Sequence, residues 1–476
     1  MKTSRGIIIN GKSVEASETI KVINPATKEV LGSVPKGNAK EARLAADAAY
    51  NALDSWSKLT AEQRSKLLVN WHQLIDENKE IIGEIMTKEQ GKPLQEAIGE
   101  VEYANSFISW YAEEGKRIYG QTVPPSSLVK RLLILKQPVG VVAAITPWNF
   151  PAAMITRKVA PALAAGCTVV IKPASQTPFT AIRLVELAHQ AGIPEGVINI
   201  VTGNASAIVS EWMNDSRVRK VTFTGSTEIG KELMKQAAGT VKKISLELGG
   251  HAPFIITKNA NLQLAAEHLI KSKFRNAGQT CVCANRIYVH KEIVEEFSKL
   301  FVEKVEKLKI GNGLDQGVVI GPLIDGNAIN KVKEQLQDAV EKGAKILTGG
   351  NEVNELSGYF LEPTVITNVT DEMQCMSEET FGPLAPITTF ESNEEVIQRA
   401  NDTPFGLAAY VFSEKLSEAI YISENLEYGI VGLNDGMPSV AQAPFGGYKE
   451  SGLGREGGLW GIEEFLEIKY ISVGLE

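Results

Sequence analysis

Strand-like and helix-like segments alternate along most of this chain, and that rhythm constrains the fold more tightly than any other feature. From residue 139 onward, short apolar runs rich in β-branched residues are separated by longer segments with helical periodicity. Strands are expected at 141–145, 168–171, 198–201, 218–223 and 243–246, and helices at 152–165, 180–190 and 227–238. Such alternation predicts a parallel sheet covered by helices, which is an α/β architecture.

A second alternating series begins after Gly250. Strands are expected at 253–256 and 286–289, and helices at 261–275 and up to Leu308. Before the first series, residues 39–116 favour helices and residues 131–136 favour a strand. The last expected strand, residues 463–473, alternates in polarity, so it could pair with another chain. A length of 476 residues predicts two to four domains.

Composition excludes several classes of protein. Hydrophobic residues make up 43% and charged residues 22% of the chain, and the net charge of −8 disfavours nucleic acid as a partner. No apolar run approaches the roughly 18 residues of a membrane span, and residues 1–10 lack the hydrophobic core of a signal peptide. The four cysteines do not form a disulfide framework for a chain this long, so the reducing cytoplasm is expected.

Three residues could carry chemistry, and each also has an ordinary structural interpretation. Cys281 lies in a polar, Gly-containing segment that suits an accessible thiol, although most cysteines are packing residues. Glu247 ends an apolar strand, where it could be a base in a cleft or a solvated charge. Asn149 also follows a strand, and its amide could cap a turn or donate to an oxyanion. His290 leaves a Cys–His thiol hydrolase open as an alternative.

Gly225 and Ser226 stand at a strand-to-helix turn, where helix N–H groups could face phosphate. The run from Gly225 to Lys231 matches most of a P-loop, but Glu232 replaces the hydroxyl that would bind magnesium, so a nucleotide triphosphatase is rejected. The histidines show no metal-ligand spacing, and no metal site is expected.

Seven segments, taken together and in order, resemble the aldehyde dehydrogenase superfamily. They cover nearly the whole chain: Pro147-Trp-Asn-Phe-Pro151, Lys172-Pro-Ala-Ser175, Phe223-Thr-Gly-Ser226, Leu246-Glu-Leu-Gly-Gly250, Asn276-Ala-Gly-Gln-Thr-Cys281, Glu379-Thr-Phe-Gly-Pro383 and Pro444-Phe-Gly-Gly447. The resemblance implies a Rossmann-like cofactor domain at 1–118 and 138–247, an α/β catalytic domain at 248–449, and a small β oligomerisation element at 119–137 and 450–476. Family members assemble as dimers or tetramers, so a homo-oligomer is expected.

The resemblance also implies a role for each candidate. Cys281 would attack the aldehyde, Asn149 and the Cys281 N–H would hold the oxyanion, and Glu247 would activate water against a thioester. The cofactor would be NADP or NAD, in a site that lacks the usual G-x-G-x-x-G fingerprint in this family. Its expected contacts are Trp148, Asn149, Lys172, Ser175, Gly225, Ser226, Leu248, Glu379 and Phe381. Ser175 stands where NAD-preferring relatives often carry Glu, so NADP is favoured.

Within the superfamily, the chain is most similar to the succinate-semialdehyde dehydrogenases. That similarity implies that Arg157, Arg275 and Ser439 bind the distal carboxylate of the aldehyde, for which the planar guanidinium fork is suited. Each arginine could instead form a structural ion pair. The similarity points to 4-aminobutyrate breakdown and suggests Cys283 as a redox partner of Cys281, although Cys283 could equally be a packing residue. Dehydrogenases for glutarate semialdehyde or a neutral aldehyde, and a non-catalytic structural protein on this scaffold, remain alternatives.

Overall fold

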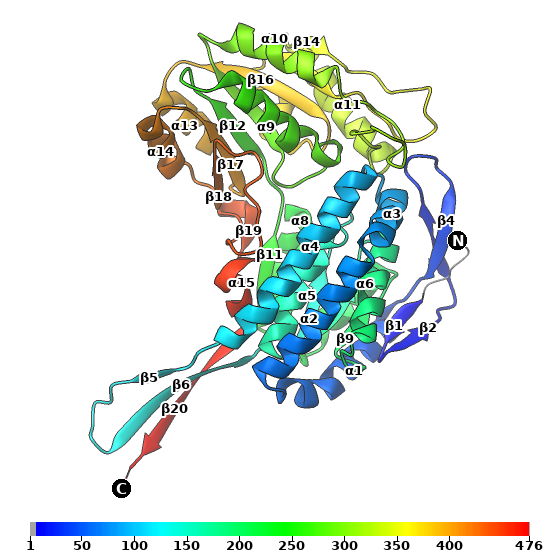
Figure 1. Cartoon of the computed structure of the whole chain (residues 1–476), viewed down its shortest axis with the longest axis vertical. Coiled ribbons are helices and arrows are strands. Elements are labelled where there is room, and N and C mark those ends of the chain that lie inside the picture. Colours follow the sequence, from blue (N-terminus) through cyan, green and yellow to red (C-terminus); the bar gives the residue numbers. More distant parts are fainter. Residues whose placement is uncertain (1–5, 476) are drawn as a thin grey trace.

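The computed structural model describes residues 6–475 and shows two α/β units with a projecting β arm (Figure 1). The N-terminal unit holds an eight-stranded sheet and the C-terminal unit a seven-stranded sheet. The chain passes between them after β11, and returns to the first unit near its end to form β19 and α15.

The eight-stranded sheet has the order β19-β11-β10-β7-β8-β9-β1-β2. Its strands are β1 (Ile7–Ile9), β2 (Lys12–Val14), β7 (Val141–Ile145), β8 (Thr168–Lys172), β9 (Ile198–Ile200), β10 (Val218–Thr224), β11 (Lys243–Glu247) and β19 (Gly452–Leu453). The five central strands are parallel, as the alternating sequence predicts, while β19 and the β1–β2 hairpin add antiparallel edges. A small two-stranded sheet pairs β3 (Thr19–Ile23) with β4 (Val30–Pro35).

Helices cover both faces of this sheet and bury their apolar faces against it. They are α1 (Ala39–Ser57), α2 (Ala61–Glu77), α3 (Lys79–Gln90), α4 (Leu94–Glu114), η1 (Gly115–Arg117), α5 (Ala153–Ala165), α6 (Pro178–Gln190), α7 (Ala205–Asn214), α8 (Thr227–Ala238), η3 (Lys449–Ser451) and α15 (Gly458–Glu463). α5 is buried along its whole length and packs against α4, so side chains on α5 are held between layers.

The seven-stranded sheet has the order β14-β15-β16-β13-β12-β17-β18. Its strands are β12 (Ala252–Ile256), β13 (Ala284–His290), β14 (Lys345–Thr348), β15 (Thr364–Thr367), β16 (Leu384–Phe390), β17 (Ala408–Phe412) and β18 (Ile430–Leu433). Its helices are α9 (Leu262–Phe274), η2 (Arg275–Gly278), α10 (Val294–Val305), α11 (Gly326–Glu341), α12 (Gln374–Ser377), α13 (Asn393–Asn401) and α14 (Leu416–Asn425). Apart from β14, the strands run parallel.

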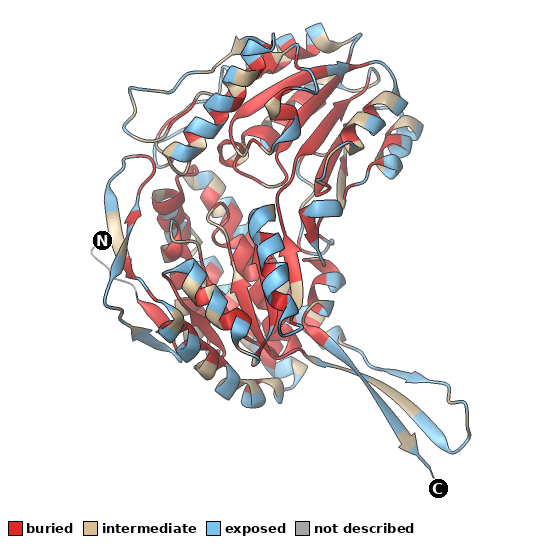
Figure 2. Cartoon of the chain, turned by 180° about the vertical axis from the view of Figure 1, so that it is seen from behind, coloured by how far each residue is buried: buried red, intermediate tan, exposed pale blue. Residues whose placement is uncertain are grey.

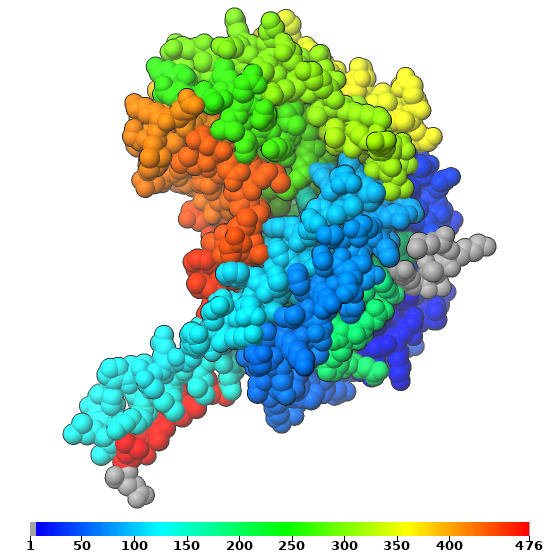
Figure 3. Space-filling view, in the orientation of Figure 1, coloured from blue at the N-terminus to red at the C-terminus, as the bar shows by residue number. Residues whose placement is uncertain are grey.

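The arm is a three-stranded antiparallel sheet of β5 (Gln121–Val123), β6 (Lys130–Pro138) and β20 (Leu466–Gly474), and it stands away from the body in the space-filling view (Figure 3). Viewed from behind, the two central sheets are buried, whereas most of the arm is exposed (Figure 2). The strand β20 is an edge strand with only β6 beside it. Unlike the boundary expected from the sequence, residues 450–465 contact the N-terminal unit through β19 and α15, and only the segment after Phe465 joins the arm.

Most expected elements lie where the periodicity placed them, with the expected helix at 227–238 coinciding with α8. The expected helical region at 39–116 is four helices. Residues 1–5, part of the region judged for a signal peptide, lie outside the described residues. Among residues 6–475, no helix has the length and apolar character needed to cross a membrane.

Candidate active site

Polar candidates gather where the parallel strands of the N-terminal unit end. Ile145 at the end of β7 pairs with Lys172 on β8 and with Phe223 on β10, while Thr224 pairs with Glu247 on β11. The loops that follow β7 and β10 carry Asn149 and Ser226. Since parallel strands end at the same edge of a sheet, the expected catalytic and cofactor residues of this unit share one edge.

Cys281 lies between two cavities, in the loop that connects α9 to β13. One cavity, of about 290 Å³, is lined by Lys92, Glu96, Gly99, Glu100, Tyr103, Phe150, Met154, Arg157, Arg275, Thr280, Cys281, Val282, Met437, Ser439 and Phe445. The other, of about 350 Å³, is lined by Pro147, Trp148, Asn149, Met154, Thr224, Gly225, Ser226, Leu248, Gly249, Cys281, Asn327, Ala328, Lys331, Glu379, Thr380 and Phe381. We call these the arginine cavity and the cofactor cleft. Of the residues that the structure describes, Cys281 and Met154 alone line both.

The surroundings of Cys281 keep its thiol protonated near neutral pH. Burial raises the pKa of the Cys281 thiol to about 12, and the charges of Glu379 and Glu247 add to that rise, against the opposing charges of Arg157 and Arg275. Because the thiolate is the nucleophilic form, a reaction at this sulfur requires a group that removes the proton.

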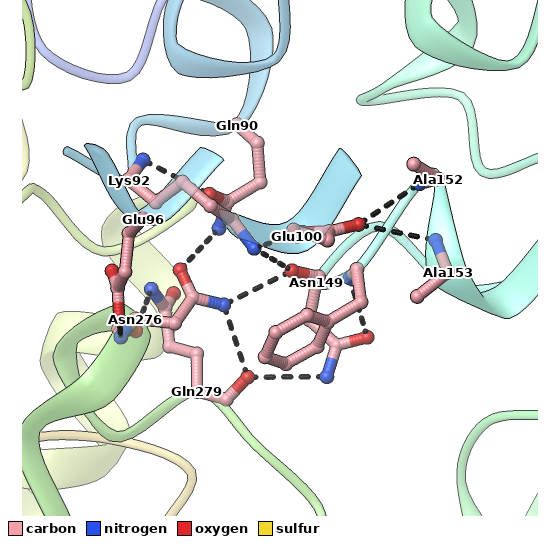
Figure 4. A network of polar contacts seen from close by, with 10 residues as sticks. Gln90, Lys92, Glu96, Glu100, Asn149, Ala152, Ala153, Asn276 and Gln279 are labelled. Carbon is pink, nitrogen blue, oxygen red and sulfur yellow. Dashed lines mark hydrogen bonds and ion pairs between the residues drawn. The ribbon is translucent and has the colours of Figure 1, made fainter. Parts of the chain in front are cut away.

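The amide of Asn149 has a fixed orientation (Figure 4). Its Nδ2 donates to the Gln279 carbonyl at 3.1 Å, and its Oδ1 accepts from the Phe150 N–H at 3.1 Å. An amide nitrogen carries two N–H bonds, so one remains to donate to an oxygen in the cofactor cleft, which Asn149 lines. An amide held in this way could donate to an oxyanion.

Glu247 is buried at the end of β11 and lies against the loop at Gly446, where a Cβ would come within 3.0 Å of Glu247 Oε1. Its Oε2 has no hydrogen-bond partner within the described part of the chain. Burial raises the pKa of Glu247 well above its usual value, and the charge of Glu456 raises it further. A carboxyl with a raised pKa binds a proton readily, as a general base must. Glu247 is not among the described residues that line either cavity.

Glu456 is a residue of the site that the sequence did not reveal. Its carboxylate pairs with Arg157 (Nη2–Oε2 2.7 Å) and with Lys158, whose Nζ also donates to Thr224 Oγ1 at 2.6 Å. Burial opposes ionisation of Glu456, but Lys158 and Arg157 lower its pKa overall. The ion-pair alternative for Arg157 is therefore present, although the same side chain also lines the arginine cavity.

The three residues expected to bind a distal carboxylate all line the arginine cavity. Arg157 stacks over the Phe445 ring at 3.9 Å and is tied to Glu456, whereas Arg275 lies over the Phe150 ring at 5.1 Å. The Nε atoms of Arg275 and Arg157 both lack a hydrogen-bond partner among residues 6–475, while Arg157 Nη2 lies 2.7 Å from Glu456 Oε2. Both guanidinium groups could attract an anion that enters this cavity, with the Ser439 hydroxyl lining the same space.

The cofactor cleft brings together six of the expected cofactor contacts in addition to Asn149. Trp148 and Phe381 meet edge to face with ring centroids 5.6 Å apart. Glu379 Oε1 accepts from the Gly250 N–H at 3.0 Å, and burial raises the pKa of Glu379 to about 7. Leu248, Gly225 and Ser226 complete this group.

These residues fit a nicotinamide dinucleotide. Ser226 is the N-cap of α8, a helix whose first-turn N–H groups have no intrahelical acceptor and can bind phosphate. At Gly249, a Cβ would lie 3.2 Å from Glu379 Oε2, so a larger residue would crowd the Glu379 carboxylate. Glu379 would hold a ribose and Phe381 a ring.

Lys172 and Ser175, two further expected cofactor contacts, do not line the cleft. The Lys172 Nζ donates to the Pro173 carbonyl at 2.6 Å, and burial lowers the pKa of Lys172 to about 8. Ser175 is half-buried beyond the end of β8. Lys172 ends β8 and Ser175 follows it, so both lie at the edge of the sheet where the neighbouring strands also end.

The remaining candidates are separated from the two cavities. His290 lies at the far end of β13 from Cys281, and its ring contacts the Glu391 carbonyl, so the thiol hydrolase alternative lacks its base. Cys283 is buried, with its Sγ 3.3 Å from Lys273 Nζ, and it lines neither cavity. In the described range 6–475, no group of three or more His, Cys, Asp or Glu side chains could hold a metal ion.

Known proteins resemble this chain in sequence and in fold. The profile of the Aldehyde dehydrogenase family matches residues 13–471. The chain is 56% identical to a succinate-semialdehyde dehydrogenase (NADP(+)) of Escherichia coli (strain K12), covering 98% of this chain and 97% of the relative. It is 55% identical to a glutarate-semialdehyde dehydrogenase of Pseudomonas putida, again covering 98% and 97%. A crystal structure of an E. coli NADP-dependent enzyme superposes with a TM-score of 0.98 at 55% identity, covering 99% of this chain and 98% of that one.

Proposed function

The chain belongs to the aldehyde dehydrogenase family, and we propose that it oxidises succinate semialdehyde to succinate with NADP or NAD. One observation carries this proposal: Cys281 stands between a cavity that holds two arginines and a cleft shaped for a nicotinamide dinucleotide. A short aldehyde bound by its far carboxylate in the arginine cavity would present its carbonyl carbon to the sulfur.

Each residue of the site has a distinct task in this reaction. The half-buried Cys281 thiol first loses its proton to solvent, and the thiolate Sγ then adds to the aldehyde carbon. The new oxyanion accepts from the free Asn149 N–H and the Cys281 backbone N–H. The bound cofactor supplies the hydride acceptor for oxidation. Glu247, whose raised pKa suits proton uptake, then removes a proton from the water that releases the acid from the Cys281 thioester.

The expected carboxylate contacts do not contribute equally. Arg275 would be the principal anchor, because Arg157 already shares its charge with Glu456. Arg157 would add a second, weaker attraction, and Ser439 a hydroxyl. Glutarate semialdehyde stays open as an alternative substrate, since a relative that is 55% identical is a glutarate-semialdehyde dehydrogenase. Glutarate semialdehyde is one methylene longer than succinate semialdehyde and has the same aldehyde and carboxylate end groups.

NADP is the proposed preference. Ser175 places no negative charge at the position where a carboxylate would repel a 2′-phosphate, and Lys172 lies nearby in sequence. The E. coli relative is named for NADP(+).

One spectrophotometric assay tests substrate and cofactor together. The absorbance of reduced cofactor is followed with succinate semialdehyde, glutarate semialdehyde and propanal, each with NADP and with NAD. The expected order of kcat/KM is succinate semialdehyde, then glutarate semialdehyde, then propanal, with NADP above NAD. A higher kcat/KM for propanal than for both acids would refute the carboxylate anchor.

We also propose that the arm assembles dimers or tetramers, since β20 offers an open edge with exposed Ile468 and Tyr470.

The four cysteines are free, which supports a reducing compartment such as the cytoplasm. A succinate-semialdehyde dehydrogenase would take its substrate from 4-aminobutyrate breakdown. For Cys283, burial and the Lys273 contact support packing at least as well as disulfide formation with Cys281.

A further inference from the structure

The loop that delivers Cys281 begins in a conformation that L residues rarely adopt. Asn276, Ala277 and Gly278 follow one another with φ of 52°, 53° and 78°. Two of the three are not glycine, so this backbone persists only where surrounding contacts determine it. At Gly278 even a Cβ is excluded, because it would lie 2.2 Å from the Gly382 carbonyl oxygen.

Asn276 uses every one of its polar groups in hydrogen bonds (Figure 4). Its N–H donates to both oxygens of Glu96, at 2.8 and 3.1 Å, and its carbonyl accepts from Gln279 Nε2 at 2.9 Å. Its side-chain Oδ1 accepts from Gln90 Nε2 at 2.8 Å, while Nδ2 donates to the carbonyls of Asn149 and Gln279, at 3.0 and 3.2 Å. Because Gln90 supplies a donor on one side and two carbonyls lie on the other, the amide cannot be flipped.

These contacts connect the two loops that meet in the reaction. The Gln279 carbonyl accepts from Nδ2 of Asn276 and from Nδ2 of Asn149, so one oxygen two residues before Cys281 orients both amides. The backbone carbonyl of Asn149 in turn accepts from Asn276. We propose that Asn276 is a positioning residue. It fixes the Asn149 amide, the donor to the oxyanion, relative to the sulfur of Cys281, and it does not contact the aldehyde.

The corner between α3 and α4 holds this arrangement from the N-terminal unit. Gln90 and Glu96 bind Asn276 directly. Lys92 Nζ donates to the Asn149 carbonyl at 2.8 Å and pairs with Glu100 at 2.5 Å. The second oxygen of Glu100 accepts from the Ala152 N–H at 2.9 Å, at the start of the helix that carries Arg157. The corner thus fixes the nucleophile loop, the oxyanion loop and an end of α5 relative to one another.

Loss of the relative position of the Asn149 amide and the Cys281 sulfur would affect kcat more than the binding of aldehyde or cofactor. Asn276 lines neither cavity, so its removal leaves the carboxylate and cofactor contacts in place. A displacement of about 1 Å between reacting groups costs about 100-fold in rate. The Asn276→Asp variant keeps size and the Gln90 acceptor but turns a carboxylate oxygen toward two carbonyl oxygens.

The matched control is Asn199→Asp. Asn199 is fully buried in the N-terminal unit, and its amide likewise donates to a backbone carbonyl, that of Gly196 at 2.7 Å, but it lies on β9 and lines neither cavity. Both variants lose a buried amide donor, so both should lower Tm. Only Asn276→Asp should lower kcat, by about 100-fold, with KM and cofactor Kd within about 3-fold of wild type.

The rate of Cys281 alkylation tells a misplaced oxyanion donor apart from damage to the thiol itself. Alkylation of Cys281 by iodoacetamide reports access and ionisation of the sulfur and needs no oxyanion donor, so its rate should stay within about 3-fold of wild type. A kcat reduced no more than in Asn199→Asp would overturn the proposal, as would an alkylation rate that falls by the same factor as kcat. Should Asn276→Asp not fold, Gln90→Leu, expected to lower kcat about 10-fold, is judged by the same two criteria.

The inference rests on the proposed function, both for the choice of aldehyde and for the roles of Cys281 and Asn149. Wild-type protein that oxidises propanal but not succinate semialdehyde would refute the proposed substrate, and the variant ratios would then be measured with propanal. Wild-type turnover of succinate semialdehyde combined with an unchanged kcat in both Asn276→Asp and Gln90→Leu would refute the positioning role alone.

Discussion

The arginine cavity and the cofactor cleft meet at Cys281 but are built differently. Five Lys, Arg or Glu side chains line the arginine cavity, namely Lys92, Glu96, Glu100, Arg157 and Arg275, against Lys331 and Glu379 in the cleft. The cleft instead presents glycine backbone, the α8 N-terminus and an aromatic pair. Recognition by main-chain groups is insensitive to substitution, whereas recognition by charged side chains is readily changed. Substrate choice should therefore be altered by single residues more easily than dinucleotide binding.

The largest expected effect comes from the residue that both sides share. Cys281→Ala should reduce kcat by more than about 10,000-fold, because no other group can form the covalent intermediate. Binding on each side should survive, since the arginines and Glu379 are untouched. Calorimetric titration with succinate, and separately with NADP, checks this. A loss of binding on either side would show that the two cavities are not separable at Cys281.

The second largest effect is expected for Glu247, the proposed general base, whose loss should slow the reaction without weakening binding in the arginine cavity or the cofactor cleft. Glu247→Gln should lower kcat by about 100- to 1,000-fold and leave KM and cofactor Kd near wild type, because Glu247 lines neither cavity. Release of acid from the thioester should become limiting, which rapid mixing would show as a burst of reduced cofactor of one equivalent per site.

The pH profile tests the same residue. A base acts when deprotonated, so a pKa raised by burial and by Glu456 makes kcat of wild type rise with pH and level off only above that raised pKa. In Glu247→Gln, kcat should no longer rise with pH in this way. A variant that retains the wild-type pH profile would assign the rise to another group, such as the Cys281 thiol.

How far the sequence could predict the site depends on how far apart the interacting residues are in the chain. Strand ends are local features and could be predicted from neighbouring residues. The segments around Cys281, Glu247 and Asn149 are also local, but each left a structural interpretation open, and only the ordered set of seven motifs implied their roles. The Lys92–Asn149 contact spans 57 positions and the Lys158–Glu456 ion pair spans 298, so no local pattern signals them. Burial of charged groups decides their pKa, and burial is a property of the packed structure.

The fold shows the same limit at its edges. The parallel core of the first sheet followed from periodicity, but β19 is two residues long and pairs with β11, which lies near the middle of the chain. The β1–β2 hairpin was missed although its Asn10-Gly11 turn, with φ of 51° and 73°, is a recognisable hairpin signal. The first omission was unavoidable, while the second was a signal left unused.

The third prediction compares Arg275 and Arg157, the two arginines that line the arginine cavity. Arg275→Leu should raise KM for succinate semialdehyde by about 10- to 100-fold, as expected for loss of a charge-assisted hydrogen bond to a carboxylate, and leave propanal within about 3-fold. Arg157→Leu should lower activity toward both aldehydes and lower Tm, because Glu456 loses one of its two buried cations. Equal effects of Arg275→Leu on both substrates would contradict the carboxylate anchor.

The smallest expected effect tests whether the cofactor side can be altered at all by one charge. Ser175→Glu places a carboxylate in a half-buried position beyond β8, where the 2′-phosphate of NADP is proposed to lie. Repulsion between like charges should raise KM for NADP by about 10-fold, while NAD, which lacks that phosphate, should be affected little. Ser175→Gln, of similar size but uncharged, is the control and should leave the NADP-to-NAD ratio of kcat/KM nearly unchanged. The shift should shrink at high ionic strength, because a half-exposed charge is screened. Equal changes in Ser175→Glu and Ser175→Gln would mean that the position acts through its volume, and the cofactor cleft would then select by shape where the arginine cavity selects by charge.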